Sequence, residues 1–171
     1  MASGKEIKAR IKSIKNTGKI TKAMELISTV KMKKSQESVL SLRPFALAAL
    51  EILARVSHEE SVLGVFGIAP ETSRELIILV AAQKGLCGGY NVNTFKKATE
   101  YICDDAVTVR EYDYITIGKR ARDFILRTGQ SLLADFSDEI ADPLTVAESR
   151  RMVRFAISEW KTGKYTKLSI V

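Results

Sequence analysis

The sequence predicts an α/β protein, in which a small, doubly wound and mostly parallel sheet follows a long N-terminal helix of the coiled-coil type. Residues 1–57 are rich in Lys, Ala, Ile and Met, and contain no proline before Pro44, as expected for a long helix. From residue 74 onward, short apolar runs alternate with amphipathic segments, which indicates strands joined by helical crossovers. The 171 residues, 46% of them hydrophobic, suffice for one packed domain beside this helix.

Basic residues are concentrated in the predicted helix. Between Lys5 and Lys34, ten Lys or Arg residues stand against only Glu6 and Glu25, a local net charge of +8, whereas the whole chain carries +7. Charge this localised indicates that one element of the protein meets an acidic or anionic partner.

Apolar residues of the helix follow two faces. One face is here called the N-terminal seam and consists of Ile7, Ile11, Ile14, Gly18 and Thr21. Its residues are separated by alternating steps of four and three, as in a coiled coil, and its side chains become smaller toward Thr21. A second series with the same spacing is Ile20, Ala23, Ile27 and Val30, with Met24 beside it. Two apolar faces predict two partners. The alternative is an ordinary core helix with a solvated lysine face.

The pattern changes twice after residue 34. Arg43-Pro44 predicts a kink or a short break, after which residues 45–57 resume a helical stripe. The segment 58–73, with Gly64, Gly67 and Pro70, is predicted to be a linker. Residues 74–171 then form the α/β domain, with strands at 76–82, 114–117, 131–134 and 167–171 and helices at 92–106, 119–127 and 144–161. Asn91 or Asn93 is the expected N-cap of the first of these helices.

Three glycines, Gly85, Gly88 and Gly89, stand between the first predicted strand and the helix that follows it. Glycines in this position can cradle a phosphate group. The spacing fits neither a P-loop nor a dinucleotide fingerprint, and no acidic residue ends the second strand, where Gly118-Lys119 stands instead. The sequence therefore favours a structural turn.

Residues suited to catalysis or metal binding are sparse. His58 is the only histidine, and Cys87 and Cys103 are the only cysteines, with no Cys-x-x-Cys pair. We therefore expect no catalytic residue, no metal, no cofactor and no small-molecule substrate. No apolar run reaches 18 residues, so no membrane-spanning helix is expected.

Several short motifs together resemble the γ subunit of F-type ATP synthase. They are Ile-Lys-Asn-Thr at 14–17, Lys-Ile-Thr-Lys-Ala-Met-Glu at 19–25, Lys31-Met32, Arg43-Pro44-Phe45 and, above all, Gly-Leu-Cys-Gly-Gly-Tyr-Asn at 85–91. The resemblance implies a non-catalytic rotor in the central stalk, which couples proton flow to ATP synthesis and hydrolysis. It implies as partners the α and β subunits of the F1 ring, the ε subunit and the c-ring, and a peripheral position at the cytoplasmic face of the bacterial inner membrane.

The resemblance also implies a contact surface. The residues that would face the β-subunit loops are Ile20, Lys22, Met24, Lys31, Lys33 and Lys34. Members of this family have a second long helix near the C-terminus that pairs with the first, whereas this chain stops at Val171. We therefore expect an amino-terminal portion without that helix, whose N-terminal seam associates with other copies.

Two other functions remain open. A nucleic-acid-binding protein with a basic helical arm would explain the charge, and its affinity would fall steeply with salt, although the arm has no interleaved aromatic residues. A small doubly wound nucleotide enzyme would explain the sheet and the glycine turn. Each alternative explains only one half of the chain.

Overall fold

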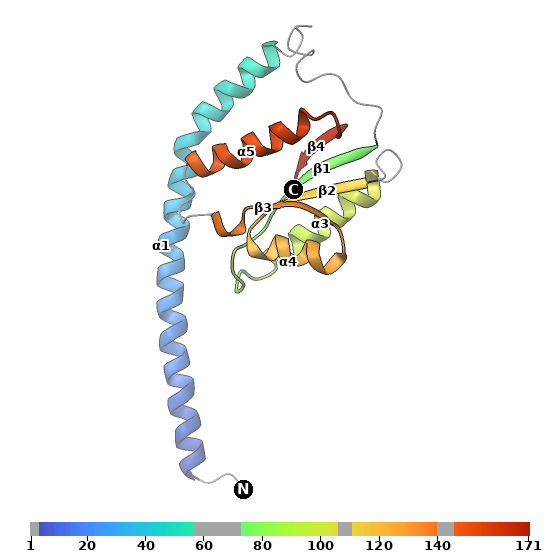
Figure 1. Ribbon diagram of the computed structural model, residues 1–171. Helices are drawn as coiled ribbons and strands as arrows, with labels where there is room; N and C mark the ends of the chain where they lie inside the picture. The colour runs from blue at the N-terminus through green and yellow to red at the C-terminus, as the bar shows by residue number, and fades with distance from the viewer. Residues whose placement is uncertain (1–3, 57–72, 106–110, 140–145) are drawn as a thin grey trace. The chain divides into compact units, whose positions relative to one another are not determined.

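The computed structural model describes residues 4–56, 73–105, 111–139 and 146–171 (Figure 1). In chain order the elements are α1 (Gly4–Val56), β1 (Arg74–Val80), α3 (Tyr90–Asp105), β2 (Glu111–Ile117), α4 (Lys119–Thr128), β3 (Ser131–Asp135), the short 3-10 helix η1 (Ser137–Glu139), α5 (Val146–Trp160) and β4 (Lys167–Ile170). The chain divides into two units, Met1–Glu59 and Glu60–Val171. Except for Ser73, the predicted linker lies outside the described residues.

The first unit contains one element, the 53-residue helix α1. Pro44 lies inside α1, which continues to Val56, so no break occurs at that proline. Three threonine hydroxyls, those of Thr17, Thr21 and Thr29, donate hydrogen bonds to the backbone carbonyl four residues earlier. Their polar groups are therefore satisfied within the helix, and none of the described side chains of α1 is buried.

The second unit contains a four-stranded sheet in the order β3-β2-β1-β4, and all three strand pairs are parallel. Parallel neighbours need crossover connections, which α3, α4 and α5 supply. Helices α3 and α4 pack on one face of the sheet and α5 on the other, as the two hydrophobic clusters show. The predicted doubly wound α/β fold is confirmed.

The central strand β1 is covered on both faces. Leu76 and Ile78 point into one cluster with Met152 of α5, whereas Ile77 and Leu79 point into the other, with the α3 and α4 residues. Successive side chains of a strand alternate between faces, so burial on both sides requires an unbroken apolar run. This is the physical reason why the sequence of β1 contains a continuous apolar segment. On the second face, the rings of Phe95 in α3 and Phe124 in α4 stack with centroids 4.3 Å apart.

The predicted cap of the first crossover helix is wrong. Helix α3 begins at Tyr90, so Asn91 and Asn93 both lie in its first turn. The backbone N–H of Asn93 donates to the carbonyl of Gly89 at 2.9 Å, and the N–H of Tyr90 donates to the carbonyl of Cys87. The glycine turn, rather than an asparagine side chain, thus starts the helix.

Candidate interaction surface

The predicted contact residues on α1 divide between two sides of the helix. Each residue advances about 100° around the axis, so positions separated by three, four or seven residues share a face. Ile20, Met24, Lys31 and Lys34 follow this spacing, together with Ile27 of the second apolar series. Lys22 and Lys33 share a face with each other on the opposite side. The helix therefore does not gather all six predicted contact residues into one surface.

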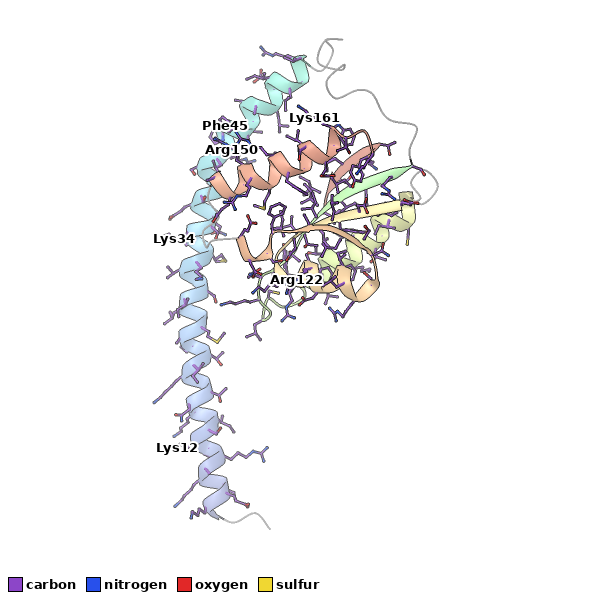
Figure 2. The ribbon with its side chains drawn as sticks, in the orientation of Figure 1. Lys12, Lys34, Phe45, Arg122, Arg150 and Lys161 are labelled. Atoms are coloured by element: carbon purple, nitrogen blue, oxygen red, sulfur yellow. The ribbon has the colours of Figure 1, made fainter. Side chains whose placement is uncertain are left out.

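The face with Ile20 and Met24 is apolar at one end and basic at the other. Both side chains are exposed, and Lys31 and Lys34 lie on the same side two turns further along. Figure 2 labels Lys34 on this part of α1 and Lys12 nearer its start. On the other side, Lys22 forms a 3.0 Å ion pair with Glu25 in which both side chains are mostly exposed. Such a pair adds little stability in water.

The N-terminal seam forms a separate surface. Ile7, Ile11 and Ile14 are 51%, 49% and 64% exposed, which is uncommon for three isoleucines in a row on one face. An open hollow lies over Gly18, between Ile14 and Thr21. A Cβ atom added to Gly18 would meet nothing within 4 Å, so the hollow has room for a side chain from a partner.

The glycine turn after β1 has a specific backbone geometry. Leu86 and Gly88 have positive φ angles of 62° and 59°, whereas Gly85 and Gly89 do not. Leu86 is the only described non-glycine residue with a positive φ, and its side chain is 93% exposed. Of the three predicted turn glycines, only Gly88 is required by its own backbone conformation.

Asn91 holds this turn to the end of β1. Its side-chain oxygen accepts a hydrogen bond from the N–H of Ala82 at 3.0 Å, and its amide nitrogen donates to Sγ of Cys87 at 3.0 Å. The N–H of Tyr90 donates to the carbonyl of Cys87 within the turn, and the N–H of Asn93 makes the first regular backbone bond of α3, to the carbonyl of Gly89.

A glycine outside the predicted site set has the tightest environment. Gly118, between β2 and α4, has φ 98°, and a Cβ atom there would lie 2.1 Å from the carbonyl oxygen of Ala81. The neighbouring backbone connects the same two loops, because the N–H of Arg120 donates to the carbonyl of Ala82. The sequence contains a signal for this position, a glycine directly between a strand and a helix.

Polar groups at the carboxyl end of the sheet converge on Asp135. Its Oδ1 accepts hydrogen bonds from the hydroxyls of Thr116 and Ser137 and from the N–H of Ser137, and Arg122 lies 3.5 Å from Oδ2. Burial alone would raise the pKa of Asp135, but these hydrogen bonds and the positive charge outweigh it and hold the pKa below its ordinary value. The network joins β2, β3 and η1.

A second network lies at the amino end of the sheet. Arg74 of β1 donates hydrogen bonds to Glu111 and, at 3.4 Å, to Asp113, and the hydroxyl of Tyr165 donates to Asp113. Burial and the bond to Asp113 raise the pKa of Tyr165. The hydrogen bond to Glu111 and the charge of Asp113 raise the pKa of Arg74. Sequence reasoning missed both networks, because the partners lie far apart along the chain.

In the described ranges, no three His, Cys, Asp or Glu side chains come together in a way that could hold an ion. No helix among the described residues is long and apolar enough to cross a membrane.

Fold and surface together define the chain as a small parallel α/β protein that carries a long, basic and exposed N-terminal helix. A family model described as ATP synthase matches residues 3–171. The chain belongs to the ATP synthase gamma chain family.

Curated relatives agree with this assignment. The ATP synthase gamma chain of Herpetosiphon aurantiacus is 43% identical over 136 residues, which cover 77% of this chain and 46% of that protein. The gamma chain of Opitutus terrae is 36% identical and that of Pelotomaculum thermopropionicum 32% identical, and each match covers 100% of this chain. The chain spans 55% and 59% of the length of these two relatives.

Proposed function

We propose that the chain acts in an ATP synthase as part of the rotor of the central stalk, where it couples proton flow to ATP synthesis and hydrolysis. In this role α1 enters the ring of α and β subunits, and the α/β domain contacts the ε subunit and the c-ring. The complex lies at the cytoplasmic face of the bacterial inner membrane, with this subunit as a peripheral component. The subunit itself is non-catalytic, and the nucleotide chemistry belongs to the ring.

The surface of α1 is the observation that carries this proposal. A 53-residue helix has an exposed apolar seam on one side and an exposed apolar-to-basic face, with Ile20, Met24, Lys31 and Lys34, on another. One side can bind a helix while the other contacts a surrounding ring. A rotating, asymmetric helix can change the conformation of a ring subunit only if its contacts with that subunit differ from one rotational position to the next.

The proposal is tested in a chimera in which this sequence replaces the matching part of the Herpetosiphon aurantiacus gamma chain, assembled with the other subunits of that synthase. Replacement of Lys31, Lys33 and Lys34 together by Gln should lower the number of protons pumped per ATP hydrolysed. Each exposed charge contact contributes only about 0.2 to 1 kcal/mol, and of the three lysines Lys31 and Lys34 share one face of α1, so their effects are expected to add. Proton pumping and ATP hydrolysis are measured on the same inverted vesicles.

Position on the helix supplies the control. Lys8, Lys12 and Lys15, replaced together by Gln, remove the same charge nearer the start of α1 and outside the predicted contact set. Loss of coupling in the first triple variant alone supports the rotor contact. Unchanged pumping per ATP in that variant over a range of salt concentrations would show that these lysines are merely solvated.

A further inference from the structure

The strand β1 is the first element of the α/β domain, and the chain reaches it from α1 through residues 57–73. Any pull on that segment therefore enters the domain at Ser73 and Arg74. Because β1 lies between β2 and β4 and is parallel to both, its amino end lies beside theirs. We propose that this end of the sheet is a mechanical clamp, which lets the domain resist tension applied through the chain that enters β1. The clamp is a property of the domain alone and does not depend on the proposed function.

The side chain of Arg74 fastens β1 to β2. Its guanidinium donates through Nε and Nη2 to Oε2 of Glu111, and through Nη1 to Oδ2 of Asp113 at 3.4 Å. Next to it, the backbone N–H of Glu111 donates to the carbonyl of Ser73 at 3.3 Å. Hydrogen bonds between ionised groups are roughly twice as strong as those between neutral groups. The point at which tension would enter is thus bound to the neighbouring strand by charged side chains as well as by the backbone.

The segment just before β4 fastens the same residue from the other side. The N–H and the hydroxyl of Thr166 both donate to the carbonyl of Arg74, at 2.9 and 3.1 Å. The hydroxyl of Tyr165 donates to Oδ2 of Asp113, the atom that Arg74 also reaches. Asp113 is buried, so water competes little for these bonds. One carboxylate of β2 therefore joins the start of β1 to the segment that leads into β4.

A buried polar group extends the clamp to α3. Oε1 of Glu75, a fully buried residue, accepts a hydrogen bond of 2.7 Å from the hydroxyl of Tyr101, and that hydroxyl lies 2.8 Å from Oγ of Ser169 in β4. Among the described residues, Oε2 of Glu75 has no hydrogen-bond partner. A shift of β1 that breaks the bond to Tyr101 would leave the buried carboxyl group without its printed partner, which is costly. Glu75 therefore opposes the first step of any such shift.

The direction of the strands decides how the clamp is loaded. The parallel pair of β1 and β4 starts with Glu75 opposite Lys167, and a further bond joins the N–H of Val80 to the carbonyl of Val171. A pull on the start of β1 against the end of β4 acts along both strands, so all the bonds between them carry the force at once. A pull on the starts of both strands acts across the ladder and breaks the bonds one after another. The first geometry should therefore resist the greater force.

Single-molecule force measurements on the whole 171-residue chain test this geometry. Cys87→Ser and Cys103→Ser remove the natural thiols, and new cysteines carry the handles. Ser73→Cys with Val171→Cys loads β1 and β4 along their length, whereas Ser73→Cys with Lys164→Cys pulls at the amino ends of both strands. At the same loading rate, the first pair should unfold at the higher force. Equal unfolding forces for the two pairs would overturn the clamp.

Removal of the charged bonds is the second test, with handles at residues 73 and 171. Arg74→Met should raise the rate of unfolding at constant force about tenfold, as expected for the loss of a hydrogen bond to a charged group. Thr116→Val is the matched control, because it removes a hydroxyl bond to Asp135 between β2 and β3, outside the pair of β1 and β4. It should lower the free energy of unfolding in urea but leave the rate under force nearly unchanged.

The comparison of the two variants decides the proposal. Acceleration under force by Arg74→Met alone supports the clamp. Equal acceleration by Thr116→Val would show that the amino end of the sheet adds only to overall stability, and would overturn it. If Arg74→Met does not fold, Thr166→Val supplies the same comparison, because it removes one hydroxyl bond to the carbonyl of Arg74 and keeps the backbone bond.

Discussion

The hydroxyl of Tyr165 donates a hydrogen bond of 2.9 Å to Oδ2 of Asp113, across 52 residues of sequence. Both residues are buried, with 2% and 7% of their surface exposed. Arg74 reaches the same carboxylate oxygen at 3.4 Å. The segment that follows α5 is therefore fixed to β2 and to the first residue of β1, just before β4 enters the sheet.

Tyr165→Phe removes this hydrogen bond but keeps the ring. We expect the free energy of unfolding to fall by about 1 kcal/mol, the usual net contribution of such a bond, while Asp113 keeps its contact with Arg74. Urea unfolding followed by the fluorescence of Trp160, the only tryptophan, measures the change. The exposed Tyr90, changed to Phe, is the control and should shift the unfolding free energy by less than about 0.5 kcal/mol. Equal effects of the two changes would contradict the structural role of the Tyr165 hydroxyl.

Gly118→Ala should destabilise the α/β domain more than any other substitution proposed for it. The added Cβ would lie 2.1 Å from the carbonyl oxygen of Ala81, at a φ of 98° that L-residues rarely adopt. A loss of about 3 kcal/mol or more is expected. Gly129→Ala is the matched control, because Gly129 has φ 66° but nothing within 4 Å of an added Cβ. It should cost only about 1 kcal/mol in the same unfolding measurement. A Gly118→Ala protein as stable as the Gly129→Ala protein would refute the close approach.

Asp135 should make stability depend on pH in the acidic range. Because its pKa is lower in the folded chain than in the unfolded chain, its ionised form adds stability above its ordinary pKa, and this stability is lost as the pH falls through the lowered value. Asp135→Asn should therefore cost about 2 kcal/mol at pH 7, a typical value for hydrogen bonds to a charged group, and much less near pH 2. Unfolding is measured at both pH values. A difference between parent and variant that does not change with pH would contradict the assignment.

The 171-residue chain should bind no nucleotide. The glycine turn lacks a lysine in the P-loop position, and the spacing of its glycines does not fit a dinucleotide fingerprint. Calorimetric titration with ATP, ADP and NAD should give no binding heat. Micromolar binding that Gly88→Val abolishes, in a variant with an unchanged unfolding transition of the α/β domain, would overturn the structural interpretation of this turn.

Much of the fold could be predicted because β1 and the helices have local signals. A strand buried on both faces is a continuous apolar run, and Leu76 to Leu79 have that pattern. The apolar pattern predicts that β2 begins at residue 114, whereas the strand starts at Glu111. Polar residues at its start are stabilised by Arg74 and Tyr165, which no local pattern reveals.

The candidate site was predictable to a smaller extent. The motif located the glycine turn. Gly118, by contrast, is required because the carbonyl of Ala81, just after β1, lies where a Cβ atom at residue 118 would be, and no local pattern shows this. The prediction of an asparagine N-cap is wrong, because the side chain of Asn91 bonds to the N–H of Ala82 instead of to the first turn of its own helix. On α1, spacing identified two apolar faces, whereas the resemblance supplied contact residues that the helix distributes over opposite sides.

The position of β4 beside β1 has a consequence for the order of events during synthesis. The hydroxyl of Thr166 meets the carbonyl of Arg74 across 92 residues, so this edge of the sheet has no partner until nearly the whole described chain has left the ribosome. Translation at about 5 to 20 residues per second leaves β1, the most apolar strand, waiting for several seconds with an open edge. Helix α1 needs only local contacts and can form within microseconds. The nascent chain thus holds a helix and a strand with one unpaired edge at the same time, and that edge stays open until β4 pairs with β1.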